Sequence, residues 1–145
     1  MANEAVLLQE YSLPVNFTCA DAGTGIAQGA ILKLSTPNTA SLANGDANYV
    51  AGICQTEKPT TTSGDGTTSV STYIDGVFNL YVSGSVTAGQ AVMTSASTSG
   101  SNICVAATAS AIGCKTLGIA LADHSGVASA IAVRLQPGCN NTAYA

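Results

Sequence analysis

The sequence predicts an all-β chain, a small barrel or sandwich of short strands with an extended N-terminal arm. Three observations support this fold class. Apolar and polar residues alternate in several short runs, as expected when one face of a strand is buried. Clusters of Gly, Ser, Thr and Asn separate these runs and are typical of turns. No stretch sustains apolar residues at helical spacing, and the Ala-rich residues 105–113 are the one candidate for a short helix.

The arm, residues 4–17, reads EAVLLQEYSLPVNF and is largely apolar. Pro14 excludes a continuous helix through it, because proline has no N–H and clashes with the preceding turn. Two interpretations stay open at this point. The arm could be the first strand of the chain's own sheet, or it could add a strand to a neighbouring subunit through main-chain hydrogen bonds.

A glycine-rich stretch, residues 21–35, follows the arm and raises the question of a phosphate-binding loop. The dinucleotide pattern G-x-G-x-x-G fails because Gln28 stands at its third glycine position, and no Gly-Lys-Ser/Thr sequence follows Gly29. The stretch also leads into an alternating strand rather than a helix. We therefore expect Gly29 to supply a left-handed turn before a strand.

Three runs carry the clearest strand alternation. Residues 70–82 form the longest run, which we expect to be bent or bulged at Gly76. The side chains expected on the buried faces are Val70, Ile74, Phe78, Leu80 and Val82 in this run, Leu32 and Leu34 in residues 30–34, and Ile131, Val133 and Leu135 in residues 131–135. The polar residues 60–69 and 94–102 are expected to be loops.

The chain contains a faint internal repeat. Residues 25–35 resemble residues 85–95, with Gly29 matched to Gly89, and each stretch is followed by a Gly-Ile strand, at residues 51–57 and 117–123. Two copies of one β-loop-β unit packed face to face would explain this similarity. Chance similarity in a sequence of low complexity is the alternative.

The chain is poor in charge. Only 8% of its 145 residues are charged, against about 25% in an ordinary soluble domain, so we expect much of its surface to be covered by partner subunits. The net charge of −4 and the dispersed cations argue against nucleic-acid binding. No apolar run approaches the ~20 residues that a bilayer requires, and the N-terminus does not resemble a signal peptide.

Residues that could carry chemistry are few. The single histidine, His124, lies beside Asp123, but no G-x-S-x-G motif accompanies it, so we expect no enzyme activity. No metal or cofactor is expected either, because no His/Cys cluster has ligand spacing. The five cysteines are Cys19, Cys54, Cys104, Cys114 and Cys139. They are expected to be buried, reduced thiols, with a disulfide formed after release from a cell as the alternative.

The ordered set of segments resembles the small capsid decoration, or cement, proteins of tailed bacteriophages. The resemblance runs from Met1 to about Leu135 and rests on these segments: MANEAVLLQEYSLPVNFTCADAGTGIAQGAILKLSTP, VAGICQTEK, VSTYIDGVFNL, VTAGQAVMTSAS, TLGIALAD and IAVRL. The five cysteines and the tail QPGCNNTAYA depart from the family pattern. The expected organisation is an arm or first strand at residues 1–18, a β-domain at 19–136 and a C-terminal tail at 137–145.

The resemblance implies an all-β homotrimer on the outer surface of the virion, made in the host cytoplasm. It implies a seat at three-fold or quasi-three-fold positions of the head, where the protein stabilises the lattice of the major capsid protein. A phage fibre or tail-associated protein, or a bacterial surface β-module, is the alternative. The residues expected to contact the capsid are Val6, Leu8, Tyr11, Leu13, Val15 and Phe17, and those expected in the trimer contact are Ile131, Val133 and Arg134.

Overall fold

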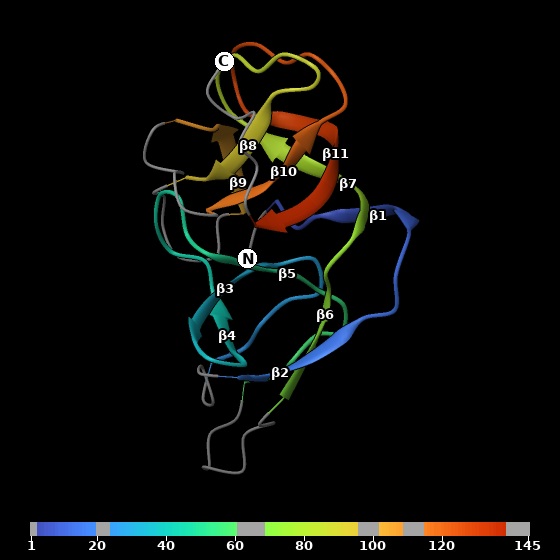
Figure 1. Cartoon of the computed structure of the whole chain (residues 1–145), viewed down its shortest axis with the longest axis vertical. Helices are drawn as coiled ribbons and strands as arrows, with labels where there is room; N and C mark the ends of the chain where they lie inside the picture. Colours follow the sequence, from blue (N-terminus) through green and yellow to red (C-terminus); the bar gives the residue numbers. More distant parts are fainter. Residues whose placement is uncertain (1–2, 20–23, 61–68, 96–101, 109–114, 139–145) are drawn as a thin grey trace.

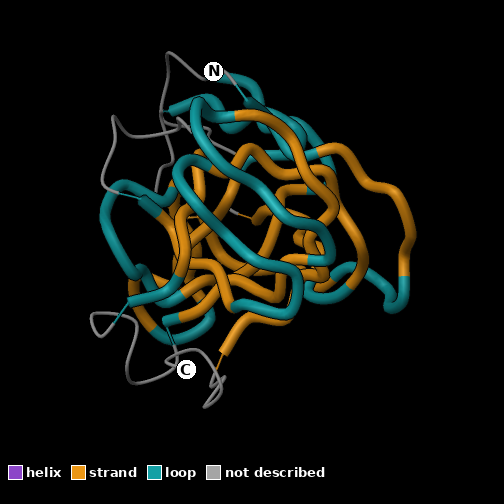
Figure 2. Tube along the Cα trace, turned by 90° about the horizontal axis from the view of Figure 1, so that it is seen from above, coloured by secondary structure: helices purple, strands orange, loops and turns teal. Residues whose placement is uncertain are grey.

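The structure, a computed structural model, describes residues 3–19, 24–60, 69–95, 102–108 and 115–138. Strands and connecting loops account for all of these residues, and no helix occurs among them (Figure 2). The all-β prediction is confirmed. The strands are β1 (Val6–Glu10), β2 (Val15–Cys19), β3 (Ile31–Thr36), β4 (Thr39–Leu42), β5 (Val50–Cys54), β6 (Ser69–Tyr73), β7 (Gly76–Val82), β8 (Ala91–Thr94), β9 (Ile103–Ala106), β10 (Thr116–Ala120) and β11 (Ser129–Gly138).

The strands form two small barrels, one above the other in Figure 1. The first barrel closes in the order β2-β4-β3-β5-β6. In the second sheet the order is β1-β7-β11-β10-β8-β9, and an additional pairing of β7 with β9 closes its last five strands into a ring. We call this ring the second barrel, with β1 attached outside it.

The two barrels have the same topology. In each, the first strand pairs in parallel with the third, and all other neighbours are antiparallel. The registers match as well. Between the first and third strands, Thr18 lies opposite Thr39 as Tyr81 lies opposite Ile103. Between the second and fourth strands the equivalent pairs are Leu32–Gly52 and Val92–Gly118, and between the fourth and fifth they are Ile53–Tyr73 and Ile119–Arg134. The predicted internal repeat is confirmed, and it extends from a β-loop-β unit to a complete five-stranded barrel.

The Gly-Ile pairs of the repeat have a steric cause. A Cβ atom on Gly52 would lie 2.1 Å from the carbonyl oxygen of Tyr73, and a Cβ on Gly118 would lie 2.0 Å from that of Arg134. Real Cβ atoms never approach a carbonyl oxygen so closely. Both barrels therefore require glycine where the fourth strand meets the fifth, which is why this dipeptide is retained in both halves.

Gly29 lies in a turn before β3, as expected. Gly29 and Gly89 have φ values of +84° and +90°, a conformation that favours glycine. The N–H of Gly29 donates to the carbonyl of Cys54 at 2.8 Å, and the N–H of Gly89 donates to that of Ala120, also at 2.8 Å. The same backbone bond thus ties the turn to the fourth strand in both barrels.

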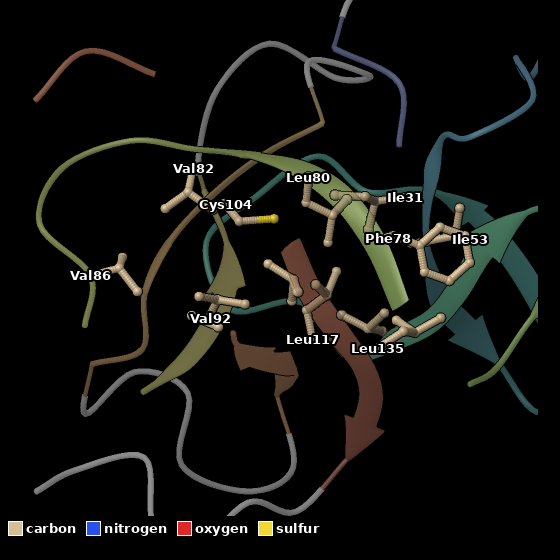
Figure 3. Packing of buried hydrophobic residues seen from close by; sticks show 13 residues of the cluster. Ile31, Ile53, Phe78, Leu80, Val82, Val86, Val92, Cys104, Leu117 and Leu135 are labelled. Atoms are coloured by element: carbon tan, nitrogen blue, oxygen red, sulfur yellow. The ribbon is translucent and has the colours of Figure 1, made fainter. Parts of the chain in front are cut away.

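β5 joins the barrels because both of its faces are buried. Ala51 and Cys54 belong to the core of the first barrel, whereas Val50 and Ile53 belong to the larger core of the second. Figure 3 shows Ile53 beside Phe78 in this larger core, together with Ile31 from β3. β3 and β5 therefore contribute side chains to the cores of both barrels.

Two residues expected on buried faces are exposed, and these predictions are wrong. Ile74 is exposed because residues 70–82 are two strands in different barrels, with the chain bending at Asp75–Gly76 between them. Leu34 is exposed because the pairing of β3 with β5 ends at Lys33, so that the β3–β4 hairpin extends past the barrel. The remaining side chains assigned to buried faces are buried or pack against a core.

Two strands lie at the limits of the expected segments. β2, which spans Val15–Cys19, lies mostly in the segment expected to be an arm or first strand, and β11 extends to Gly138. Val105 and Ala106 of the helix candidate lie in β9, and residues 109–113 fall outside the described residues. Most of the expected loops at 60–69 and 94–102 also fall outside, but the strands that flank each loop pair antiparallel.

The two equivalent turns offer a matched pair of variants. Gly89→Ala places a Cβ in open space, so we expect it to cost only the ~1–2 kcal/mol of a left-handed non-glycine residue. Gly29→Ala has the same backbone cost, and its Cβ would also lie 2.4 Å from the carbonyl oxygen of Ala5. We therefore expect Gly29→Ala to lower the free energy of unfolding further and to displace the start of the arm. Urea unfolding and hydrogen exchange of residues 3–10 measure both effects, and equal behaviour of the two variants would contradict this account.

Candidate interaction surface

The arm belongs to both barrels. Its first part, β1, pairs antiparallel with β7 of the second barrel, and its last part, β2, is a strand of the first barrel. Figure 1 shows the connection between β1 and β2 running down the outside of the molecule from one barrel to the other. Of the two interpretations of the arm, the structure supports strands in the chain's own sheets.

Two contacts hold β1 in place at its ends. Before β1, the N–H of Ala5 donates to the carbonyl of Gly29 at 2.9 Å. After β1, the guanidinium of Arg134 lies 5.4 Å from the centre of the Tyr11 ring, within the range of a cation–π contact. Arg134 Nε also lies 3.8 Å from Asp75 Oδ1. The course of the arm is thus defined although all side chains of β1 are exposed.

Most residues expected to contact the capsid are exposed. All five residues of β1 are exposed, and Leu13 shows 83% of its surface to solvent. The exposed large apolar side chains of the arm are Val6, Leu7, Leu8, Tyr11, Leu13 and Val15. Phe17 differs from the other expected residues, because it is half-buried and packs against the core of the first barrel. We call this set of exposed apolar side chains, from Val6 to Val15, the arm surface.

The residues expected in a trimer contact lie in different environments. Val133 is completely buried in the second barrel, so its side chain cannot reach a partner subunit in this fold. Ile131 is half-buried and packs against the same core. Only Arg134 is exposed, and it contacts Tyr11 of the arm. Strand alternation alone already indicated that Val133 and Arg134 face opposite ways.

A hollow of about 350 Å³ lies between the arm and the first barrel, and its lining includes Glu4, Gln28, Tyr73 and Cys54. Burial raises the pKa of the Cys54 thiol to about 11, although a backbone hydrogen bond with Thr56 opposes the shift. Since a thiolate is the reactive form, Cys54 is a poor nucleophile at neutral pH. The hollow therefore presents hydrogen-bonding groups but no activated nucleophile.

The described cysteines are buried and free. They are Cys19, Cys54 and Cys104, in agreement with the expected reduced thiols, whereas Cys114 and Cys139 fall outside the described residues. Burial raises the pKa of Cys104 to about 12.

His124 has a structural role that the repeat explains. Its Nδ1 donates to the carbonyl of Gly84 at 2.7 Å, and Nε2 accepts from the Ser129 hydroxyl at 2.9 Å. The equivalent residue of the first barrel, Lys58, is buried, and its Nζ donates to the carbonyl of Thr24 at 2.8 Å. Thr24 and Gly84 are themselves equivalent, so each barrel uses a basic side chain to hold the same loop.

No group of three or more His, Cys, Asp or Glu side chains within the described ranges could hold a metal ion. These ranges also contain no helix long and apolar enough to cross a membrane. Comparison with models of known families and with curated proteins finds no match to the chain.

We expect the buried thiols to resist modification. Cys54 and Cys104 should remain unlabelled by iodoacetamide at pH 8 in the folded protein and should react after unfolding in urea, because both remain neutral thiols when buried. Mass spectrometry of the labelled peptides measures this. Labelling of either residue at the same rate with and without urea would contradict the burial of its thiol.

The raised pKa of Cys54 also predicts a pH dependence of stability. The fold favours the neutral thiol, so the contribution is complete below the ordinary pKa of 9.0 and is lost as the pH rises toward about 11. The free energy of unfolding should therefore fall more steeply over this range in the wild type than in Cys54→Ala. Urea unfolding at a series of pH values gives both slopes, and parallel curves would exclude the effect.

Lys58 and His124 allow a comparison of the two loop contacts. Lys58→Met keeps the apolar stem but removes a buried donor, so we expect it to lower the free energy of unfolding by about 1–3 kcal/mol. His124→Phe should cost less, because His124 is only half-buried and water can replace its bonds. Thermal and urea unfolding provide the measurement, and a larger loss for His124→Phe would reverse the assignment.

Proposed function

We propose that the chain is a structural virion protein that decorates the outside of a tailed-phage head and stabilises the lattice of the major capsid protein. In this proposal three copies act together at three-fold or quasi-three-fold positions. The arm surface contacts the shell, and the barrels serve as the rigid body that carries it. The observation that carries the proposal is an arm that is fixed in position and whose large apolar side chains from Val6 to Val15 are exposed.

The arm surface has the chemistry of a contact that another protein must cover. Burying one Val or Leu side chain gives about 1.5–3 kcal/mol, so two or three of the exposed side chains supply the free energy of a specific weak contact. Contacts with β7, Gly29 and Arg134 already hold the arm, which reduces the conformational entropy lost on binding. A preorganised apolar strand is therefore suited to docking on a shell.

The low charge of the chain favours the same role. A chain with only 8% charged residues can pack closely against a protein shell with few ions to desolvate. Three linked copies would bind as one unit, which can strengthen binding by roughly 10² to 10⁴-fold over a single contact. A protein that binds the assembled lattice better than its free subunits stabilises the lattice by mass action.

The double variant Val6→Ser/Leu8→Ser tests the proposal, and Val127→Ser is its control. All three side chains are exposed, so each variant should fold, but Val127 lies in the β10–β11 connection away from the arm. We expect the double variant to bind stripped particles of the parent phage at least ~10-fold more weakly, because it loses two apolar contacts. Co-sedimentation measures binding.

Two results would contradict the proposal. One is unchanged particle binding by the double variant together with weaker binding by Val127→Ser. This result would mean that a surface other than the arm surface contacts the shell. The other is a virion in which antibodies against the chain label the tail or fibres instead of the head, as the alternative role predicts.

A further inference from the structure

The repeat exposes a difference between the barrels at the outer edge of their first strands. In the second barrel, β1 pairs along the start of β7, with Val6 opposite Asn79 and Glu10 opposite Gly76. Val15 of β2 lies opposite Thr72 of β6, as Phe78 of β7 lies opposite Val133 of β11, so Val15 and Phe78 are equivalent. Residues 13–16 of the first barrel are therefore equivalent to residues 76–79 of β7, with which β1 pairs. No described strand pairs with that edge of residues 13–16.

Backbone groups at this edge of β2 are free to pair. Thr18 lies on the side of β4, because its N–H donates to the carbonyl of Asn38 at 2.8 Å. Alternate residues of a strand direct their N–H and C=O groups to the same side, so those of Asn16 also point away from β6. Pro14 has no N–H to offer, as is common on edge strands, but its carbonyl can accept. Leu13, which directly precedes Pro14, is also exposed.

β1 has the complementary property. One edge of the strand pairs with β7, and within the described chain nothing pairs with the other. Residues 6–9 carry no charge, and the strand is exposed throughout. Proteins usually protect such an edge with charged side chains, Pro, bulges or a covering loop. On β1 such protection is limited to Glu10 at its end and the irregularity between Leu7 and Gln9, and no Lys or Pro lies in the strand.

We infer that the free edge of β1 in one copy pairs with the free edge of residues 13–16 in a second copy of this chain. The first barrel of the second copy then gains an outer strand beside β2, just as the second barrel of each copy has β1 as an outer strand beside β7. β1 becomes a central strand, with β7 on one edge and the β2 of the second copy on the other. We choose β1 as the partner of residues 13–16 because β1 already pairs with the equivalent edge of β7 within the chain.

The contact uses two different surfaces and is therefore heterologous. Each copy offers β1 to one neighbour and residues 13–16 to another, so repetition of the contact closes a ring when the rotation permits. Main-chain bonds along the edges leave one face of the arm free for a shell. The inference deepens the proposed function, in which three linked copies act as one unit, but its test is separate because association between copies requires no particle.

Three lysine variants test the contact by light scattering coupled to size exclusion, on the full chain without particles. We expect the wild type to be an oligomer at ~100 µM and Leu8→Lys and Leu13→Lys to be monomers, because each charge lies at one of the two edges. Val127→Lys, the control, changes an equally exposed apolar residue elsewhere and should keep the wild-type mass. Asn16→Pro, which removes the free N–H on β2, should also be a monomer.

Mixing the two monomeric variants distinguishes this contact from a symmetric one. A Leu13→Lys chain keeps an intact β1 edge and a Leu8→Lys chain keeps intact residues 13–16, so a 1:1 mixture should form a heterodimer of twice the monomer mass. A monomeric wild type, a wild-type mass for Leu13→Lys and Asn16→Pro, or a mixture that stays monomeric would each overturn the inference. A wild-type chain that forms the oligomer but does not bind stripped particles would contradict only the proposed function.

Discussion

Burial of β5 on both faces is the constraint on which the rest of the structure depends. Ala51 and Cys54 fill the first barrel, while Val50 and Ile53 cover the end of the second. A strand buried on both sides cannot carry a charge or a large polar group at these positions without a partner. The relative placement of the barrels follows from this shared strand, and with it the course of an arm that must reach from β7 to the first barrel.

The two barrels keep a common plan of backbone contacts although their side chains differ. Cys104 takes the place of Ala40, and His124 takes the place of Lys58, yet the strand registers and the turn hydrogen bonds agree. Both barrels keep a glycine, Gly52 or Gly118, where a neighbouring carbonyl leaves no room for a Cβ. Both also keep a basic side chain, Lys58 or His124, that donates a hydrogen bond to a loop carbonyl. Backbone geometry tolerates changes of core side chains more readily than changes at these positions.

Much of the architecture could be predicted from the sequence, since alternation and glycine turns are local signals. The strand at residues 131–135 and the turn at Gly29 are examples. The exposure of Ile74 could not, because it depends on which barrel each half of residues 70–82 enters. The division into two barrels also lies beyond local patterns, since it is set by strand pairs far apart in the chain.

The arm surface could be predicted only in part, because the sequence shows local patterns but not which segments pack together. An apolar, proline-containing arm indicated exposure of Val6, Leu8 and Leu13, whereas the burial of Phe17 requires knowing the partners of β2. The contact of Tyr11 with Arg134 joins residues that the sequence separates widely. No local pattern signals such a pair.

The pairing of β1 with β7 has a consequence for biosynthesis. The first barrel is complete at Tyr73, so it can close before the strand that pairs with β1 has been translated. The nascent chain therefore carries β1 as an unpaired apolar strand until the downstream half folds. Such a segment is a natural target for ribosome-associated chaperones, and a translational pause after the first barrel would prolong its exposure to aggregation.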